Sequence, residues 1–197
     1  MGAAAMRGNR FLLALLLTNL VCLQGCVELL LVGGATAAVA ANDRRTLGAF
    51  IDDKAMVVKG TSAINSAEGL TEVVHINVTS VNGVVLLSGE APTADARDKV
   101  LAAMRTVAGV RRIVNEIRIA APTPVSSRTN DTLLTGKVKA TLLGVKNLDS
   151  SNIKVVTENS VVYLMGLMKK EEAELAATAA ADVGGIERVV KLFEYLD

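Results

Sequence analysis

The sequence predicts an α+β fold made of two tandem modules, each with the order helix-strand-strand-helix-strand. The first observation is an internal repeat: the segment 82–89 recurs 77 residues later as 159–166, and 76–78 recurs in the same way as 153–155. The second is the form of the repeated unit, an asparagine-glycine pair followed by an apolar run, which is typical of a tight hairpin. A repeat of roughly 75 residues favours two small domains over one large one.

The two hairpins are predicted to differ at the turn. Asn82 and Gly83 suit the two positive-φ positions of a type I′ turn. Ser160 stands in the second copy where glycine stood in the first, so we expect that turn to be more strained or of another type. Further on, 107–110 matches 183–186 at an offset of 76, so one residue is missing in between. We expect the difference at the turn 91–93.

The elements of module one follow from apolar periodicity. A helix is expected to begin at Asp52 and Asp53, because acidic residues are favoured at a helix N-terminus. The next strand alternates, so that one set of side chains faces away from the core: His75, Asn77 and Thr79. A second helix over 94–107 and a strand over 112–119 complete the module. A right-handed crossover places both helices on one face of a three-stranded sheet.

Changes in composition divide the chain into five segments. We assign a signal peptide to 1–25, a lipidated N-terminus and tether to 26–50, module one to 51–119, a linker to 120–129 and module two to 130–197. The linker contains Pro122 and Pro124. Half of the residues are hydrophobic but few are aromatic, so Val, Ile, Leu and Ala must build the cores.

The N-terminus has the features of a lipoprotein signal. Two arginines precede an apolar run over 11–23, which is short for a spanning helix and suits a signal peptide. The run ends in Leu-Gln-Gly-Cys, which resembles the bacterial lipobox, and the resemblance implies that Cys26 is lipidated and becomes the first mature residue. Val27 follows where many inner-membrane lipoproteins have aspartate, which implies the outer membrane. The alternative is an ordinary signal peptide with a chance cysteine.

Composition argues against several functions. Without Arg7 and Arg10 the mature chain has 19 basic against 20 acidic residues, and a net charge of −1 does not suit nucleic-acid binding. His75 is the sole histidine and no cysteine follows Cys26, so we expect no metal site. No catalytic constellation or phosphate-binding glycine loop is found, so we expect no enzyme, no cofactor and no small-molecule substrate.

The repeated signatures resemble a known family. The segment 81–89, Val-Asn-Gly-Val-Val-Leu-Leu-Ser-Gly, and the segment 109–117, Gly-Val-Arg-Arg-Ile-Val-Asn-Glu-Ile, are similar to those of the BON domain. With the lipobox, the small-residue spacer and Asn130-Asp131-Thr132 at the second copy, the chain resembles a dual-BON outer-membrane lipoprotein. This resemblance implies a non-enzymatic envelope protein that binds anionic phospholipid, supports outer-membrane integrity and gathers at the division site.

The segment 131–145 is the most informative helix of module two. At 100° per residue, one side forms a predicted core stripe of Leu134, Val138, Thr141, Leu142 and Val145. The other side holds the residues that we expect to bind anionic phospholipid: Leu133, Gly136, Lys137, Lys139, Ala140 and Leu143. Exposed leucines flanked by lysines can enter the headgroup region while the ammonium groups meet lipid phosphates.

Other readings remain open for these residues. Leu133 can instead pack on the linker, and Leu143 on module one. The first helix of module one starts with two aspartates and has only Lys59 in its apolar part, so we expect module one to bind membranes less well. It can pack on module two or face a protein. The alternative function is a periplasmic adaptor for an outer-membrane assembly or cell-wall factor.

Overall fold

The computed structural model describes residues 44–70 and 73–196. The predicted signal peptide, Cys26 and the tether up to residue 43 lie outside the described residues. Both modules belong to one compact unit.

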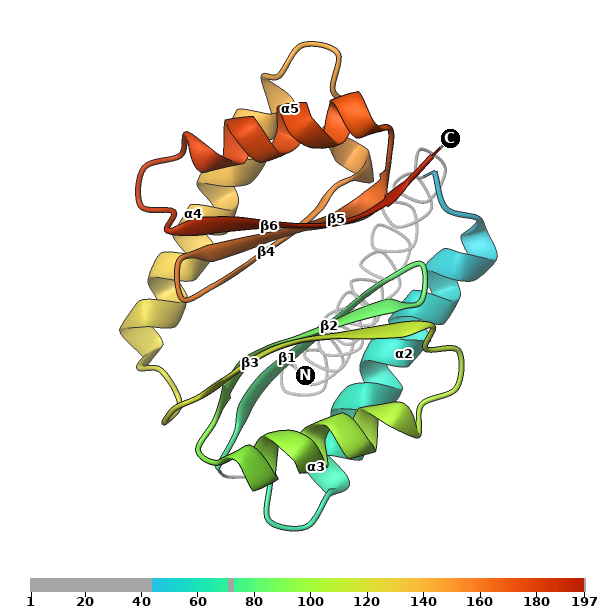
Figure 1. The fold of residues 1–197 in the computed structure, drawn as a ribbon, viewed down its shortest axis with the longest axis vertical. Helices are drawn as coiled ribbons and strands as arrows, with labels where there is room; N and C mark the ends of the chain where they lie inside the picture. Colours follow the sequence, from blue (N-terminus) through green and yellow to red (C-terminus); the bar gives the residue numbers. More distant parts are fainter. Residues whose placement is uncertain (1–43, 71–72, 197) are drawn as a thin grey trace, which may run out of the picture. The chain divides into compact units, whose positions relative to one another are not determined.

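Both modules have the predicted order of elements (Figure 1). Module one consists of α2 (Leu47–Ser66), β1 (His75–Val81), β2 (Val84–Ala91), α3 (Ala94–Arg105) and β3 (Arg112–Ile119). Module two consists of α4 (Val125–Leu143), the short 3-10 helix η1 (Ser150–Asn152), β4 (Lys154–Glu158), β5 (Val161–Met168), α5 (Lys170–Ala181) and β6 (Arg188–Tyr195). The α+β fold class is confirmed.

Each module has one three-stranded sheet with its middle strand next to both others. The orders are β1-β2-β3 and β4-β5-β6, with the first pair antiparallel and the second pair parallel in each sheet. Figure 1 shows α2 and α3 on one face of the first sheet, and α4 and α5 on one face of the second. The missing residue lies where the sequence predicted, because Pro92 and Thr93 join β2 to α3 while Lys169 alone joins β5 to α5.

Both first helices begin earlier than predicted. Thr46 caps α2 with its side chain, so the helix starts at Leu47 within the predicted tether, not at Asp52. Helix α4 starts at Val125, directly after Pro124, so the second half of the predicted linker 120–129 is helical. Proline is favoured at a helix start because its φ is already helical and its missing N–H costs nothing there.

The aspartates that the sequence placed at helix N-termini have another role. Asp53 is buried in α2 and accepts hydrogen bonds from the backbone N–H groups of Asn82 and Gly83, at 2.6 and 2.9 Å. Asp131 is buried in α4 and accepts from Asn159 and Ser160, both at 2.9 Å. In each repeat a carboxylate inside the first helix therefore fixes the hairpin turn against that helix.

The two hairpin turns share one conformation. Asn82 and Gly83 have φ values of +50° and +73°, and Asn159 and Ser160 have +50° and +62°. The first copy is the expected I′-type turn. The second keeps it despite the serine, so the strain that we predicted at Ser160 is taken up by the backbone rather than relieved by another turn.

We expect Ser160→Gly to stabilise the protein by about 0.5–1 kcal/mol, because glycine has no steric penalty in the left-handed region but loses more chain entropy on folding. The measurement is the urea midpoint of the soluble fragment 42–197. A midpoint equal to or below that of the parent would show that Ser160 is not strained.

Each module has its own core between its helices and its sheet. Module one packs Met56, Ile64, Val85, Val100 and Met104 together. In module two, Leu134, Val138 and Leu142 of α4 are buried as predicted. Thr141 is exposed, which corrects its assignment to the core stripe. Its polar side chain lies at the margin of the stripe.

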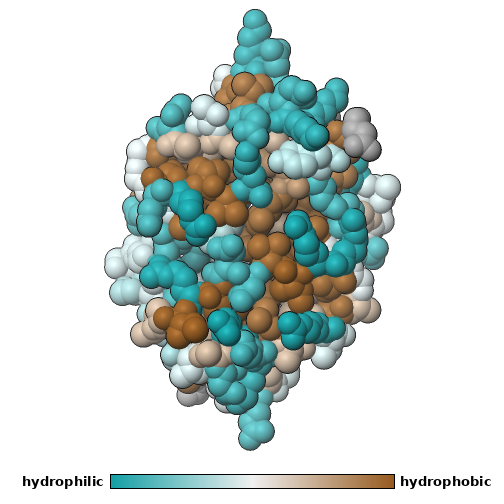
Figure 2. Space-filling view, in the orientation of Figure 1, coloured by the Kyte–Doolittle hydropathy of each residue, from teal (hydrophilic) through white to brown (hydrophobic). Residues whose placement is uncertain are grey.

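The opposite faces of the two sheets pack on each other. Val81, Val84 and Leu86 of the first sheet form one cluster with Tyr163 and Met165 of the second. The polar side of β1 thus points away from its own core as predicted, yet it faces the other module rather than water alone. Figure 2 shows apolar side chains in the middle of the face drawn, and polar ones at its upper and lower ends.

Amide-carboxylate pairs bind the two sheets at their polar positions. The Asn77 amide donates to the Glu158 carboxylate at 2.6 Å, and the Asn159 amide donates to Glu90 at 2.5 Å. Glu90 and Glu158 are both buried. Burial raises the pKa of the Glu158 carboxyl, the Asn77 bond opposes the rise, and the nearby Glu90 adds to it.

Two arginines at the start of the described chain contact different modules. The Arg44 guanidinium donates to Glu172 of α5 at 2.5 and 2.7 Å, and its backbone N–H donates to the Asn152 side chain. Arg45 pairs with Asp53 of α2 at 2.7 Å. The bond from Arg44 is the main cause that lowers the pKa of the Glu172 carboxyl to about 2, so this pair stays ionised at neutral pH.

Candidate lipid-binding surface

The exposed side of α4 holds all six residues predicted to bind phospholipid. Leu133 and Leu143 are 62% and 76% exposed, although their neighbours Leu134 and Leu142 are almost fully buried. Gly136, Lys137, Lys139 and Ala140 are exposed too. Neither leucine is buried on the linker or on module one, so the packing alternative does not account for them.

The six residues occupy one stripe along α4. Residues three, four and seven apart lie on the same side of a helix, so Leu133, Gly136, Lys137 and Ala140 follow one another along it. Leu143 continues the stripe, and Lys139 lies at the margin opposite Lys137. No heavy atom lies within 4 Å of a Cβ built on Gly136, so the centre of the stripe is open.

The stripe is longer than the sequence indicated. Val125 is 69% exposed and lies eight residues before Leu133, two turns away on the same side of α4. Sequence reasoning missed it because the proline pair and the polar run after it are also typical of a linker. The signal that could have found it was Pro124, which marks a helix start as well as a loop.

The exposed surface of α4 is strongly basic. Arg128, Lys137 and Lys139 are exposed, whereas the only acid of the helix, Asp131, is buried against the hairpin turn. The acid therefore does not offset the lysines at the surface. An open apolar stripe with cationic margins can insert leucines among lipid headgroups and attract their phosphates.

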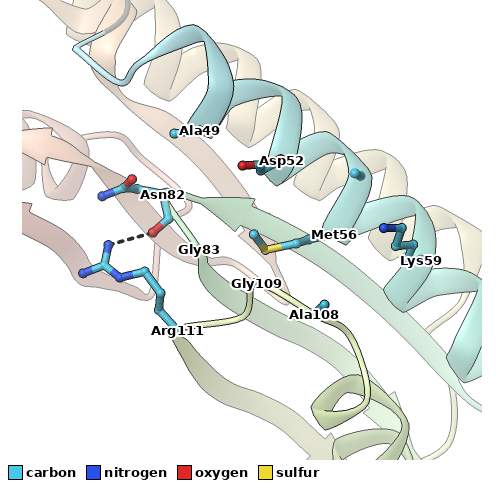
Figure 3. Close-up of a pocket in the computed structure, with 10 residues that line it drawn as sticks. Ala49, Asp52, Met56, Lys59, Asn82, Gly83, Ala108, Gly109 and Arg111 are labelled. Atoms are coloured by element: carbon cyan, nitrogen blue, oxygen red, sulfur yellow. Dashed lines mark hydrogen bonds between the residues drawn. The ribbon is translucent and has the colours of Figure 1, made fainter.

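A second candidate is a cavity of about 400 Å³ in module one, between α2, the hairpin turn and the loop before β3 (Figure 3). Asp52 and Lys59 stand at its α2 side, and Met56 and Gly109 line it. Arg111 donates to the Asn82 carbonyl at 2.9 Å and pairs with Glu194 at 3.0 Å. Its guanidinium is therefore engaged in structural contacts, and the cavity gives no reason to assign chemistry.

Residues 44–70 and 73–196 contain neither a metal-binding cluster nor a membrane-spanning helix. In this part of the chain no three His, Cys, Asp or Glu side chains converge as a metal site would require. His75 is half-buried at the start of β1. No helix of the same described part combines the length and apolar character needed to cross a bilayer.

Comparison with known proteins defines the class to which this fold belongs. The BON domain profile matches residues 54–121 and 130–197, so the chain belongs to the BON domain family, as the sequence indicated. It is 35% identical over 185 residues to the outer membrane lipoprotein DolP of Haemophilus influenzae, covering 94% of this chain and 96% of that protein.

Two further relatives match about three quarters of the chain. The chain is 32% identical to a 21 kDa hemolysin of Actinobacillus pleuropneumoniae, over 78% of this chain and 79% of that one. It is 27% identical to the osmotically inducible protein Y of Escherichia coli, over 73% of this chain and 72% of that protein. The likeness to the Haemophilus lipoprotein confirms the predicted location: this is a lipid-anchored outer-membrane protein of a Gram-negative bacterium.

Proposed function

We propose that this lipoprotein binds anionic phospholipid through the exposed stripe of α4 and thereby supports outer-membrane integrity, without enzymatic activity. The observation that carries the proposal is the pairing of exposed leucines with exposed basic residues on a helix whose single acid is turned inward. Gathering at the division site belongs to the same proposal and rests on family resemblance.

The stripe and the lipid anchor act together. Cys26 is the proposed lipidation site, and acylation there keeps module two close to the bilayer at a high effective concentration. Each basic residue near an anionic surface then adds about 1 kcal/mol to the free energy of membrane binding. Burial of a leucine side chain adds roughly 1.5–3 kcal/mol at most. Contacts that hold a free protein only weakly on a vesicle are therefore strong enough for one that is already tethered.

We expect Leu133→Glu to abolish most vesicle binding, because it removes apolar insertion and adds a negative charge beside anionic headgroups. The measurement is co-sedimentation of the fragment 42–197 with vesicles of phosphatidylethanolamine and phosphatidylglycerol. Leu175→Glu is the matched control, since Leu175 is 42% exposed on α5. Thermal unfolding of Leu133→Glu should match the parent. A destabilised variant that still binds would contradict the assignment.

Charge reversal tests the electrostatic part separately. Lys137→Glu combined with Lys139→Glu should weaken binding chiefly at low salt, because exposed charges are screened over about 8 Å at physiological ionic strength. If the parent fragment binds phosphatidylcholine vesicles as well as anionic ones, or binds neither, the adaptor function becomes the better account.

A further inference from the structure

The first helix of module one carries a second exposed apolar stripe. Leu47, Ile51 and Val58 of α2 are 61%, 57% and 69% exposed. They lie on one side of the helix, at spacings of four and seven residues, while Met56, Gly60 and Ile64 are buried on the other side. Burial within module one does not explain why this side of α2 is apolar.

This stripe is the repeat equivalent of the stripe on α4. Asp53 and Asp131 bind equivalent hairpin turns, so the two helices align at an offset of 78. At that offset Leu47 corresponds to Val125, and Lys59 corresponds to Lys137. Two aspartates argued against a membrane role for α2, but only Asp52 lies at the surface. Asp53 is 2% exposed, and its carboxylate binds the hairpin turn.

Both helices lie on the same side of the packed modules. Helix α2 packs on β1 and α4 packs on β4, and each of these is the edge strand of its sheet. The Asn77–Glu158 hydrogen bond joins those two edges. Helices α3 and α5 pack over the strands at the other edges, β3 and β6. One flat surface laid along the β1 and β4 edges therefore meets both α2 and α4.

Three exposed lysines lie on or beside the two stripes: Lys54 on α2, seven residues after Leu47, Lys139 at the margin of the α4 stripe, and Lys154 at the start of β4, the strand on which α4 packs. Lys154, at the exposed start of β4, is close enough to Lys139 of α4 and to Lys54 and Arg45 of module one to feel their charges. Partial burial lowers the pKa of the Lys154 ammonium first, and these three cations lower it further. Arg45 is paired with Asp53, which leaves three lysines at the surface. A phosphate between them would relieve their mutual repulsion.

We propose that α2 and α4 form one bilayer-facing surface, in which both apolar stripes enter the same leaflet and Lys54, Lys139 and Lys154 hold a lipid phosphate between them. This inference rests on the proposed function, because the α4 stripe is half of the surface. It adds a second contact, in module one, and a headgroup site built from both modules. The occupant is an anionic phospholipid membrane, since the apolar stripes flank a cationic centre.

The test uses the full lipoprotein reconstituted in vesicles and an environment-sensitive fluorophore attached to Ile51→Cys, Leu133→Cys or Leu175→Cys. Acylation of Cys26 leaves the introduced thiol as the reactive one, and the unsubstituted lipoprotein gives the background. On vesicles of phosphatidylethanolamine and phosphatidylglycerol, relative to phosphatidylcholine, the labels at positions 51 and 133 should shift to blue emission. The label at position 175 should not.

Lys154→Glu tests the shared cation site. It should lower the ratio of inserted to free label at position 51 roughly tenfold, because it reverses one charge at the lipid surface. Lys154→Arg should retain the response. Lys99→Glu on α3 makes the same change in net charge away from the cluster and should have no effect. The melting temperature of Lys154→Glu should match the parent, since Lys154 is exposed.

The outcomes separate the two proposals. A response at position 133 with none at 51 would overturn the two-helix surface and leave the proposed function standing. The absence of a blue shift at both positions would overturn the proposed function. A response at both positions that Lys154→Glu and Lys99→Glu change equally would overturn the lysine site.

Discussion

Asp53→Ala is expected to lower the free energy of unfolding by about 3–5 kcal/mol. The substitution removes a buried carboxylate that accepts from two backbone N–H groups of the hairpin, from the Ser80 hydroxyl at 2.6 Å and from Arg45. Four donors then lose their acceptor, and one of them is a charged group that stays partly buried. The measurement is urea unfolding of the fragment 42–197.

Asp52→Ala is the matched control, because Asp52 precedes Asp53 in α2 but is exposed. We expect it to change stability by no more than about 0.5 kcal/mol. Equal effects of the two substitutions would contradict the role that we assign to Asp53.

Gly89→Ala is expected to lower the free energy of unfolding by roughly 3 kcal/mol or more, because backbone strain and steric overlap of the new Cβ both contribute. Gly89 has φ of +112°, and a Cβ at this position would overlap the His75 carbonyl oxygen. The atom that it meets is backbone of the paired strand, so β1 and β2 would have to separate. Loss of the cooperative urea transition, or a large decrease in its midpoint, would report this.

Gly69→Ala separates the two causes. Gly69 also has a positive φ, +76°, but a Cβ added there would have no neighbour within 4 Å. Its substitution should cost only the strain of a left-handed alanine, about 1–2 kcal/mol. If Gly89→Ala cost no more than this, the close approach of β1 would not constrain that position.

The sequence predicted the parts of the fold that depend on local pattern. The repeat showed two modules, Asn82 and Gly83 showed the turn, and the change of offset from 77 to 76 showed where one residue is missing. These predictions are correct because a hairpin turn and an apolar alternation are specified by neighbouring residues.

The sheet-to-sheet contact could not be predicted in the same way. Alternation in a strand shows that its two faces differ, but not what covers the more polar face. Ser88, Glu90 and Glu158 have the composition of a solvated face, yet all three are buried. They are tolerated there because the Asn159 amide donates to Glu90, while the Asn77 amide and the Ser88 hydroxyl both donate to Glu158.

The candidate lipid-binding surface was predicted in part. Helical periodicity placed Leu133 and Leu143 on the exposed side of α4, where the structure has them. The full basic character of this surface could not be predicted, because a count along the sequence treats Asp53 and Asp131 as surface charges. Each of these carboxylates binds a turn 28 to 30 residues away and is absent from the surface, and a count along the chain cannot detect that.

The paired arginines at the start of the described chain determine how mechanical load enters this protein. The lipid anchor holds the N-terminal end of the chain, so tension on that anchor reaches the described part of the chain first at Arg44. Its contacts with Glu172 and Asn152 deliver that force to module two, and Arg45 delivers it to α2 through Asp53. Tension is thereby shared between the two modules, so that it does not act on α2 of module one alone.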